Sequence, residues 1–143
     1  MTAEQSIIAG MKAFIDNEFA PMIQQLGIIP QSVTESGAVF FVPDNAFMMR
    51  SQDIVSGQAI VSIADTVGVL TLFAHNASQR PLTTIDMTSH FMRPLTKGGM
   101  QIETRILSNG RRLATVFVEA RQQGAEKLAA SSTCAYAYLD GGS

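Results

Sequence analysis

An acidic residue interrupts the longest apolar stretch of the sequence. From Ala59 to Ala74 every residue is apolar, small or hydroxylic except Asp65. A carboxylate in such surroundings is costly unless it is hydrogen-bonded or takes part in chemistry. If the stretch is helical, Ser62, Asp65 and Thr66 share one polar stripe of the helix. Two interpretations stay open: Asp65 is an acid–base or nucleophilic catalyst, or it is a carboxylate satisfied by solvent or by a backbone group.

The residues just before this stretch could bind a carbonyl oxygen. Ser56 is a candidate N-cap, and Gly57 would then be the first residue of the helix. Amides in a first helical turn have no partner within the helix and carry the positive end of its dipole. A glycine lets a ligand approach the backbone closely, so its amide could stabilise a developing oxyanion. Ordinary helix capping is the alternative interpretation.

The other polar residues suggest less chemistry. His75 and His90 have no second histidine or acid at the spacing of metal ligands, so we predict no metal site. The serines lack the nucleophile elbow that would indicate a Ser-His-Asp triad. Cys134 is the only cysteine, which excludes a disulfide framework, and its place in an alternating segment predicts a small core residue.

These candidates need a scaffold, which the hydrophobic pattern predicts. Thr2 to Gln5 match a capping box, and the apolar spacing that follows predicts a helix over residues 3–18. Pro21 to Gly27 should end it with a short turn, and the apolar stretch after Ser56 predicts a buried helix to about residue 76. Strands are predicted over residues 28–33, 38–42, 82–92, 100–106, 113–121 and 127–139, with a loop over 44–55 and a turn at Ser108-Asn109-Gly110.

The order of these elements predicts the fold class. Consecutive strands joined by tight turns favour an antiparallel sheet. One buried helix between two groups of strands favours an α+β fold, with a curved sheet of about six strands around the central helix and a further helix at the N-terminus. No linker or repeat interrupts the chain, so residues 1–143 are predicted to form a single domain.

Composition excludes several classes of protein. Hydrophobic residues make up 46% of the chain and charged residues 15%, against about 25% charged residues in typical domains. This excludes a disordered chain and predicts that part of the surface is buried against another subunit. A net charge of −2 without a basic stripe argues against nucleic-acid binding. No export signal is visible and the apolar stretch is too short to span a membrane, so a cytoplasmic protein is predicted.

The apolar helix and the strands after it resemble a known family. The segment from Ser56 to Thr66 is similar to the His-Gly-Gly-x-x-x-x-x-Ala-Asp-Thr helix start of hot-dog-fold acyl-CoA thioesterases, with the same spacing of eight from Gly57 to Asp65. It looks most like the PaaI-like branch of the 4-hydroxybenzoyl-CoA thioesterase superfamily. The resemblance continues in the same order through Thr83-Thr84-Ile85-Asp86-Met87, Phe91-Met92-Arg93-Pro94, Gly110-Arg111-Arg112-Leu113-Ala114 and Ala135-Tyr136-Ala137-Tyr138.

The resemblance implies roles for individual residues. Asp65 matches the acidic catalyst of the family. Gly57 matches the residue whose amide polarises the thioester carbonyl. Thr84 matches a serine or threonine that helps to hold the attacking water. The resemblance implies no metal or redox cofactor, and it leaves open whether Asp65 is a general base or a nucleophile.

Five further residues are candidates for substrate binding. Ser56 and Gln58 stand where the family has its histidine and second glycine. Arg50 replaces a frequent Asn or Gln and puts a fixed charge near the helix start, where it binds a polar or acidic acyl group or a CoA phosphate, or else points into solvent. Arg111 and Arg112 follow a predicted turn and are either solvated or in contact with CoA phosphates.

The helix spacing predicts how such a site is assembled. Eight residues of helix rise about 12 Å, so Gly57 and Asp65 of one chain cannot both touch one thioester. Two antiparallel helices in a two-fold dimer could bring Gly57 of one chain near Asp65 of the other, and the resembled family is built as such dimers. We expect this chain to form the same dimer or a dimer of dimers. We therefore expect an acyl-CoA thioesterase with shared sites. The main alternative is a non-catalytic acyl-CoA-binding or assembly module. A hydroxyacyl thioester dehydratase would need a histidine paired with an acid, which His75 and His90 do not provide.

Overall fold

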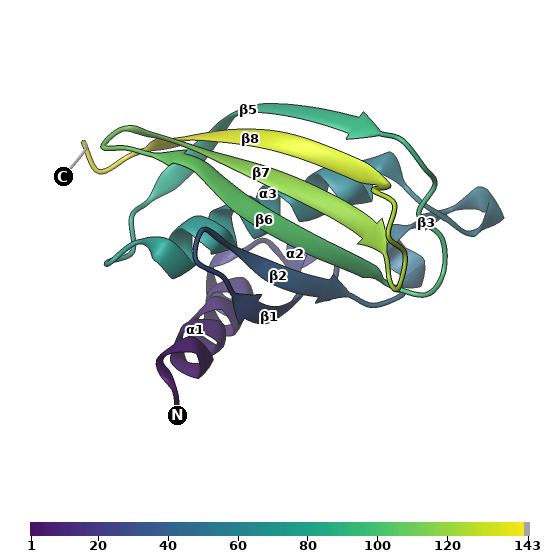
Figure 1. The fold of residues 1–143 in the computed structure, drawn as a ribbon, viewed down its shortest axis with the longest axis horizontal. Helices are drawn as coiled ribbons and strands as arrows, with labels where there is room; N and C mark the ends of the chain where they lie inside the picture. The colour runs from purple at the N-terminus through teal and green to yellow at the C-terminus, as the bar shows by residue number, and fades with distance from the viewer. Residues whose placement is uncertain (142–143) are drawn as a thin grey trace.

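A six-stranded antiparallel sheet curves around one long helix in the computed structural model of the chain (Figure 1). The structure describes residues 1–141, so positions 142 and 143 of the predicted domain lie outside the described residues. The strand order is β1-β2-β6-β7-β8-β5, which confirms the predicted α+β class. The main elements are α1 (Ala3–Glu18), α2 (Pro21–Gln24), β1 (Ile29–Val33), β2 (Gly37–Val42), α3 (Gly57–His75), β5 (Leu82–Phe91), β6 (Met100–Asn109), β7 (Leu113–Gln122) and β8 (Ala130–Tyr138).

Helix α3 is the centre of the core. Its buried apolar side chains include Ile60, Ile63, Ala64, Val67, Leu70 and Leu72. The prediction that the apolar stretch is too short to span a membrane is wrong, because the helix extends beyond that stretch to 19 residues and could cross one by length and composition. However, 61% of its apolar window is buried inside the protein, as expected of a core helix. Polar contacts attach its C-terminal half to the sheet. The hydroxyls of Thr71 and Thr104 lie 2.6 Å apart, and Nε2 of His75 donates to the carbonyl of Gly37 at 2.8 Å.

Helix α1 forms as predicted and closes one end of the core. Its capping box is complete, because the Thr2 hydroxyl accepts from the amide of Gln5 and the Gln5 side chain accepts from the amide of Thr2. Phe14 of α1 packs against Phe73 of α3 with ring centroids 4.8 Å apart. The C-terminal end of α1 therefore lies beside the C-terminal half of α3.

Strand β5 forms one edge of the sheet and pairs only with β8 among the described strands. It is ten residues long and mostly exposed, with Ile85 54% and Phe91 52% accessible. A bulge between Thr84 and Asp86 interrupts the regular ladder between β5 and β8. A long exposed edge of this kind is a template for pairing with another chain unless something covers it.

Three connections differ from the prediction. The turn expected over Pro21–Gly27 contains the four-residue helix α2, which proline can start because its missing N–H is not needed there. The loop expected over 44–55 holds two 3₁₀ turns, η1 (Ala46–Met48) and η2 (Ser51–Asp53), and a small hairpin of β3 (Met49–Arg50) and β4 (Ile54–Val55). Strand β6 runs on to Asn109, so the turn before β7 lies over 110–112.

Candidate active site

The carboxylate of Asp65 is attached to the edge of the sheet. The hydroxyl of Thr84 in β5 donates a 2.7 Å hydrogen bond to Oδ1 of Asp65 in α3. Asp65 is half-buried and Thr84 is exposed, so the carboxylate stays open to solvent on one side. A hydroxyl that donates to an ionised carboxylate stabilises the charge and fixes the side chain. The structure therefore brings together two of the predicted site residues.

The other members of the predicted polar stripe turn away from this contact. The hydroxyl of Ser62 donates to the carbonyl of Gln58 at 2.9 Å, and that of Thr66 donates to the carbonyl of Ser62 at 2.7 Å. Serine and threonine in a helix often bond in this way to the carbonyl four residues earlier. The stripe thus contributes only Asp65 to the site.

A pocket of about 400 Å³ opens beside Asp65 and Thr84. Its apolar wall comes from the ends of α1 and α3 and the start of β5, and consists of Phe14, Phe19, Val69, Phe73 and Leu82. Its polar rim consists of Glu18, Asn76, Gln79, Arg80 and Thr83, besides Asp65 and Thr84 themselves. The apolar wall beside the carboxylate suits an apolar group bonded to the carbon that reacts, and the polar rim suits the rest of a polar substrate.

The start of α3 is capped as predicted, and this leaves the first amide of the helix available. The Ser56 hydroxyl accepts from the amide of Ala59 at 3.2 Å. Gly57 is the first helical residue, and its amide has no acceptor within the helix. A Cβ at Gly57 would meet only the Phe91 ring, 3.9 Å away, so the chain itself does not need glycine there. The open space in front of Gly57 is therefore available to a ligand.

Gly57 and Asp65 of one chain open onto different pockets. Gly57 lines a pocket of about 330 Å³ together with Arg50 and Phe91, and it does not line the pocket of Asp65. The eight residues between them correspond to a rise of about 12 Å along α3. Within one chain, the amide and the carboxylate therefore cannot act on the same carbonyl group.

The pocket of Gly57 is positively charged. Arg50 and Arg93 both line it, and no acidic residue is among its lining residues. Arg93 is fixed by a 3.0 Å hydrogen bond to the carbonyl of Leu128, whereas Arg50 is exposed in the small β3–β4 hairpin. Gln58 is also exposed and lies beside this pocket, in a shallow depression shared with Gly57. The structure thus places Arg50 and Gln58 close to the helix start, as the sequence predicted.

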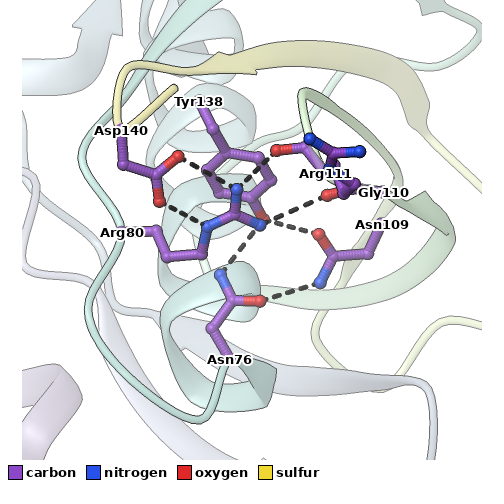
Figure 2. Close-up of polar contacts among 7 residues, drawn as sticks. All are labelled: Asn76, Arg80, Asn109, Gly110, Arg111, Tyr138 and Asp140. Atoms are coloured by element: carbon purple, nitrogen blue, oxygen red, sulfur yellow. Dashed lines mark hydrogen bonds and ion pairs between the residues drawn. The ribbon is translucent and has the colours of Figure 1, made fainter. Parts of the chain in front are cut away.

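Arg111 and Arg112 lie at the other end of the molecule, in the turn between β6 and β7. The neighbouring Arg80 contacts both this turn and the residues at the end of β8, and so connects the two (Figure 2). Its guanidinium pairs with Asp140 at 2.7 Å, donates to the carbonyls of Gly110 and Arg111, and lies 3.5 Å from the ring centroid of Tyr138. Arg80 also lines the pocket of Asp65, so its rigid placement fixes one side of that pocket.

The histidines and the cysteine take no part in either pocket. His75 is bonded to the sheet, and His90 is exposed in β5. Cys134 is buried as predicted, and burial raises the pKa of its thiol to about 11. Among residues 1–141, no three His, Cys, Asp or Glu side chains come together as a metal-binding group.

Two contacts near the site were not predicted from the sequence. The Tyr136 hydroxyl in β8 donates to the carbonyl of Asp65 at 3.0 Å, and the Phe91 ring lies beside Gly57. Gly68 could have indicated the contact of Tyr136 with α3 from the sequence, because a glycine inside a buried helix often marks the close approach of another group.

Comparison with known proteins places the chain in a family. A model of the thioesterase superfamily matches residues 52–129, more than half of the 143 residues. The protein TV1331 of Thermoplasma volcanium, an inferred esterase, is 26% identical over 110 residues, which is 77% of this chain and 80% of its own length.

Solved structures of thioesterases have the same fold. Thioesterase HI1161 from Haemophilus influenzae superposes with a TM-score of 0.82 at 17% identity, covering 94% of this chain and 91% of its own. Thioesterase superfamily member 2 from Mus musculus gives a TM-score of 0.79 at 17% identity and covers 97% and 98%. These likenesses confirm the predicted hot-dog fold. With the family match, they show that the chain belongs to the thioesterase superfamily and is a thioester hydrolase.

Proposed function

We propose that this protein is a cytoplasmic, PaaI-like enzyme that hydrolyses an acyl-CoA to the free acid and CoA, with each active site shared between two subunits. The observation that carries the proposal is the carboxylate of Asp65. It is the only charged side chain in the first eighteen residues of α3, it borders a pocket, and Thr84 fixes it. A fixed carboxylate that borders a pocket can act as the base or nucleophile that ester hydrolysis needs.

The proposed chemistry divides between two groups. The amide of Gly57 donates to the thioester oxygen and stabilises the negative charge that develops as the carbonyl is attacked. Asp65 of the other subunit either takes a proton from water, whose oxygen then bonds to the carbonyl carbon, or attacks that carbon itself. Direct attack gives an anhydride between Asp65 and the acyl group, which a water molecule then hydrolyses to the free acid, regenerating the Asp65 carboxylate and supplying the proton of the thiol. In both routes the carbon–sulfur bond breaks and CoA leaves as its thiol. Thr84 holds Asp65 or the attacking water.

Two features support a shared site. Gly57 and Asp65 of one chain border different pockets, so a second chain must supply the missing group. The exposed edge strand β5, which carries Thr84 and Phe91, offers an unpaired row of backbone groups where a second copy could attach. A two-fold dimer with antiparallel α3 helices would place Gly57 of one protomer near Asp65 of its partner, twice. A dimer of dimers would keep the same two-fold unit.

The substrate would extend in two directions from the thioester. The apolar wall that includes Phe14 and Phe73 suits the acyl chain. Arg50 is proposed to bind a polar acyl group or a CoA phosphate, and Ser56 and Gln58 to shape the helix start around the thioester. Arg111 and Arg112 stay candidates for CoA phosphates from the partner's side.

A panel of acyl-CoA substrates tests the activity directly. Release of CoA is followed with a thiol reagent, and we expect turnover of at least one class of acyl chain. The buried Cys134 should not contribute to the signal while the protein is folded. Tight acyl-CoA binding without CoA release would instead support the non-catalytic binding module.

A mixing experiment tests the shared site. Chains carrying Gly57→Pro and chains carrying Asp65→Asn are unfolded together and refolded as mixed dimers. Each mixed dimer then has one site with both defects and one intact site, so activity should recover to about a quarter of the wild-type value. If each site lies within one chain, every site keeps one defect and no activity returns.

Light scattering tests the assembly itself. We expect at least twice the mass of one chain at micromolar concentration, and activity per chain should fall when dilution dissociates the dimer. A stable, active monomer would contradict the shared site.

A further inference from the structure

Two hydroxyls from adjacent strands donate hydrogen bonds to Asp65, one to its carboxylate and one to its backbone carbonyl. Thr84 in β5 and Tyr136 in β8 are direct partners in the ladder between these strands. The Thr84 hydroxyl donates to the carboxylate of Asp65 at 2.7 Å, and the Tyr136 hydroxyl donates to the backbone carbonyl of the same residue at 3.0 Å. The three residues therefore form a closed set of contacts that links α3, β5 and β8.

We propose that Tyr136 is a positioning residue for Asp65: its hydroxyl fixes the helix turn that carries the carboxylate, at the depth where Thr84 can hold it. This proposal rests on the proposed role of Asp65 in catalysis. Tyr136 itself is fully buried and lines neither the pocket of Asp65 nor that of Gly57. Its effect must therefore pass through Asp65 and the turn of α3 that carries it.

Helix α3 has a glycine, Gly68, at the point where the Tyr136 side chain packs against it. A Cβ atom at Gly68 would lie 2.0 Å from the Tyr136 oxygen and 3.0 Å from Cζ. Contacts under 3 Å are far inside van der Waals distance, so any other residue at position 68 would push the ring away. Glycine is unfavourable inside a helix compared with alanine. The fold nevertheless places glycine where the hydroxyl approaches, three residues after Asp65.

The Tyr136 hydroxyl can only act as a donor in this contact. A carbonyl oxygen has no proton to give, so the tyrosine must donate. Burial raises the pKa of Tyr136 well above its ordinary value, which keeps the hydroxyl protonated throughout the range in which the enzyme would be assayed. The contact should therefore persist at every assay pH.

Cys134, the preceding inward side chain of β8, supports a positioning role of this strand toward α3. Cys134 lies two residues before Tyr136, and its sulfur is 3.9 Å from the carbonyl of Ala64. Strand β8 thus contacts two successive carbonyls of α3, those of Ala64 and Asp65. The sheet is anchored to the helix at the turn that presents the carboxylate.

The expected consequence of loosening this turn is kinetic. A displacement of about 1 Å of a reacting group can cost about 10²-fold in rate. Tyr136→Phe keeps the ring and removes only the hydroxyl, so a smaller displacement is expected. We expect kcat to fall at least about fivefold while KM for the best acyl-CoA stays within about twofold, because no substrate contact is lost.

The chain offers a matched control for this variant. Tyr138 is also buried, lies two positions further along β8, and uses its hydroxyl to donate to Asn109 and to accept from Asn76. Tyr138→Phe therefore removes a hydroxyl that is slightly less buried and has no contact with Asp65. Because its partner Asn76 lies on the rim of the Asp65 pocket, the two variants are compared by kcat and not by KM. We expect Tyr138→Phe to lower thermal stability like Tyr136→Phe but to leave kcat within about twofold of wild type. Equal kcat losses in the two variants would overturn the proposal, because they would indicate a general packing effect.

A second variant approaches the same contact from the helix. Gly68→Ala keeps the Tyr136 hydroxyl but displaces it, so it should lower kcat without changing KM. Unchanged kcat in Gly68→Ala or in Tyr136→Phe would overturn the positioning role. If Tyr136→Phe fails to fold, the kinetics of Gly68→Ala alone decide the question. Asp65→Asn distinguishes the two proposals: if it remains active the proposed function fails, whereas an inactive Asp65→Asn with unaffected Tyr136→Phe removes only this inference.

Discussion

The hydroxyl of Thr84 donates to the carboxylate of Asp65 and so joins the edge strand of the sheet to its central helix. The same carboxylate lines the pocket of about 400 Å³. The same strand forms the exposed edge where we propose that a partner subunit attaches. Catalyst position and subunit assembly would therefore depend on one strand.

Replacement of Asp65 by asparagine tests the catalyst. Asn has the same shape and can still accept from Thr84, so the fold and the dimer should persist. It cannot accept a proton or attack as a carboxylate, so kcat should fall by about 10²-fold or more. Steady-state kinetics on the best acyl-CoA measure this, with light scattering as the check on assembly.

Asp86 provides the control for the loss of one negative charge. It lies two residues after Thr84 in the same strand, is exposed, and lines neither the pocket of Asp65 nor that of Gly57. Asp86→Asn should keep kcat within about twofold. Retention of most activity by Asp65→Asn would exclude Asp65 as the catalyst.

Two substitutions at Gly57 distinguish the role of its N–H group from the role of the space left by its missing side chain. Proline is well suited to the first position of a helix, and Ser56 already has the extended backbone that a following proline requires. Gly57→Pro removes the N–H without opposing the helix, and loss of one oxyanion donor should lower kcat by about 10²–10³-fold. Circular dichroism and thermal unfolding should show an intact fold.

Gly57→Ala keeps the N–H and adds one methyl group. The nearest atoms of the chain to that methyl are in the Phe91 ring, 3.9 Å away, so stability should rise by up to about 1 kcal/mol. An enzyme that is more stable but has a higher KM would show that the space belongs to the substrate. If Gly57→Pro is as active as Gly57→Ala, the amide is not the oxyanion donor.

Much of this arrangement could be predicted because it depends on local sequence. The capping box at Thr2 and the cap at Ser56 set the starts of α1 and α3, and both are where the sequence predicted them. The carboxylate in an apolar helix also indicated Asp65 without any knowledge of the fold. Strand bounds at the ends were less accurate, because they depend on where ladder partners stop; β8 begins at Ala130 rather than at residue 127.

The remaining features depend on contacts between distant residues. Tyr136 reaches Asp65 across 71 positions of sequence, and no local pattern specifies which inward tyrosine of β8 meets which turn of α3. The β3–β4 hairpin has positive φ angles at Gln52 and Asp53. Aspartate is common at such angles, but glutamine is not. Formation of the hairpin therefore depends on the surrounding structure more than on turn chemistry.

Cys134 should make the fold sensitive to high pH. Burial raises the pKa of its thiol to about 11, above the value in an unfolded chain. A group of this kind stabilises the native state fully below its unfolded pKa, and the stabilisation is lost as pH rises through the folded pKa. The free energy of unfolding should therefore fall between about pH 9 and 11, and it should fall less steeply in Cys134→Ala. Urea titrations at several pH values measure both slopes, and equal slopes would exclude the thiol as the cause.

Arg50 should decide which charged group the enzyme binds beside Gly57. It lines the same pocket as Gly57, and none of the residues that line this pocket is acidic. Arg50→Gln removes the charge and restores the amide that the resembled family often has. If the guanidinium contacts the acyl group, KM should rise several-fold for acidic or polar acyl-CoAs and stay unchanged for simple alkyl ones. If it contacts a phosphate of CoA, KM should rise for every acyl-CoA alike.

Arg93 is the comparison that makes the Arg50 result specific. It lines the same pocket, but its guanidinium already donates a hydrogen bond to the carbonyl of Leu128. Arg93→Gln should therefore lower stability more than Arg50→Gln does, and should affect all substrates equally. Arg50 in turn is exposed and free of that constraint, so its replacement should leave the melting temperature unchanged while altering the ranking of substrates. Unchanged kinetics of Arg50→Gln across the whole panel would show that Arg50 faces solvent and that its charge plays no part in binding.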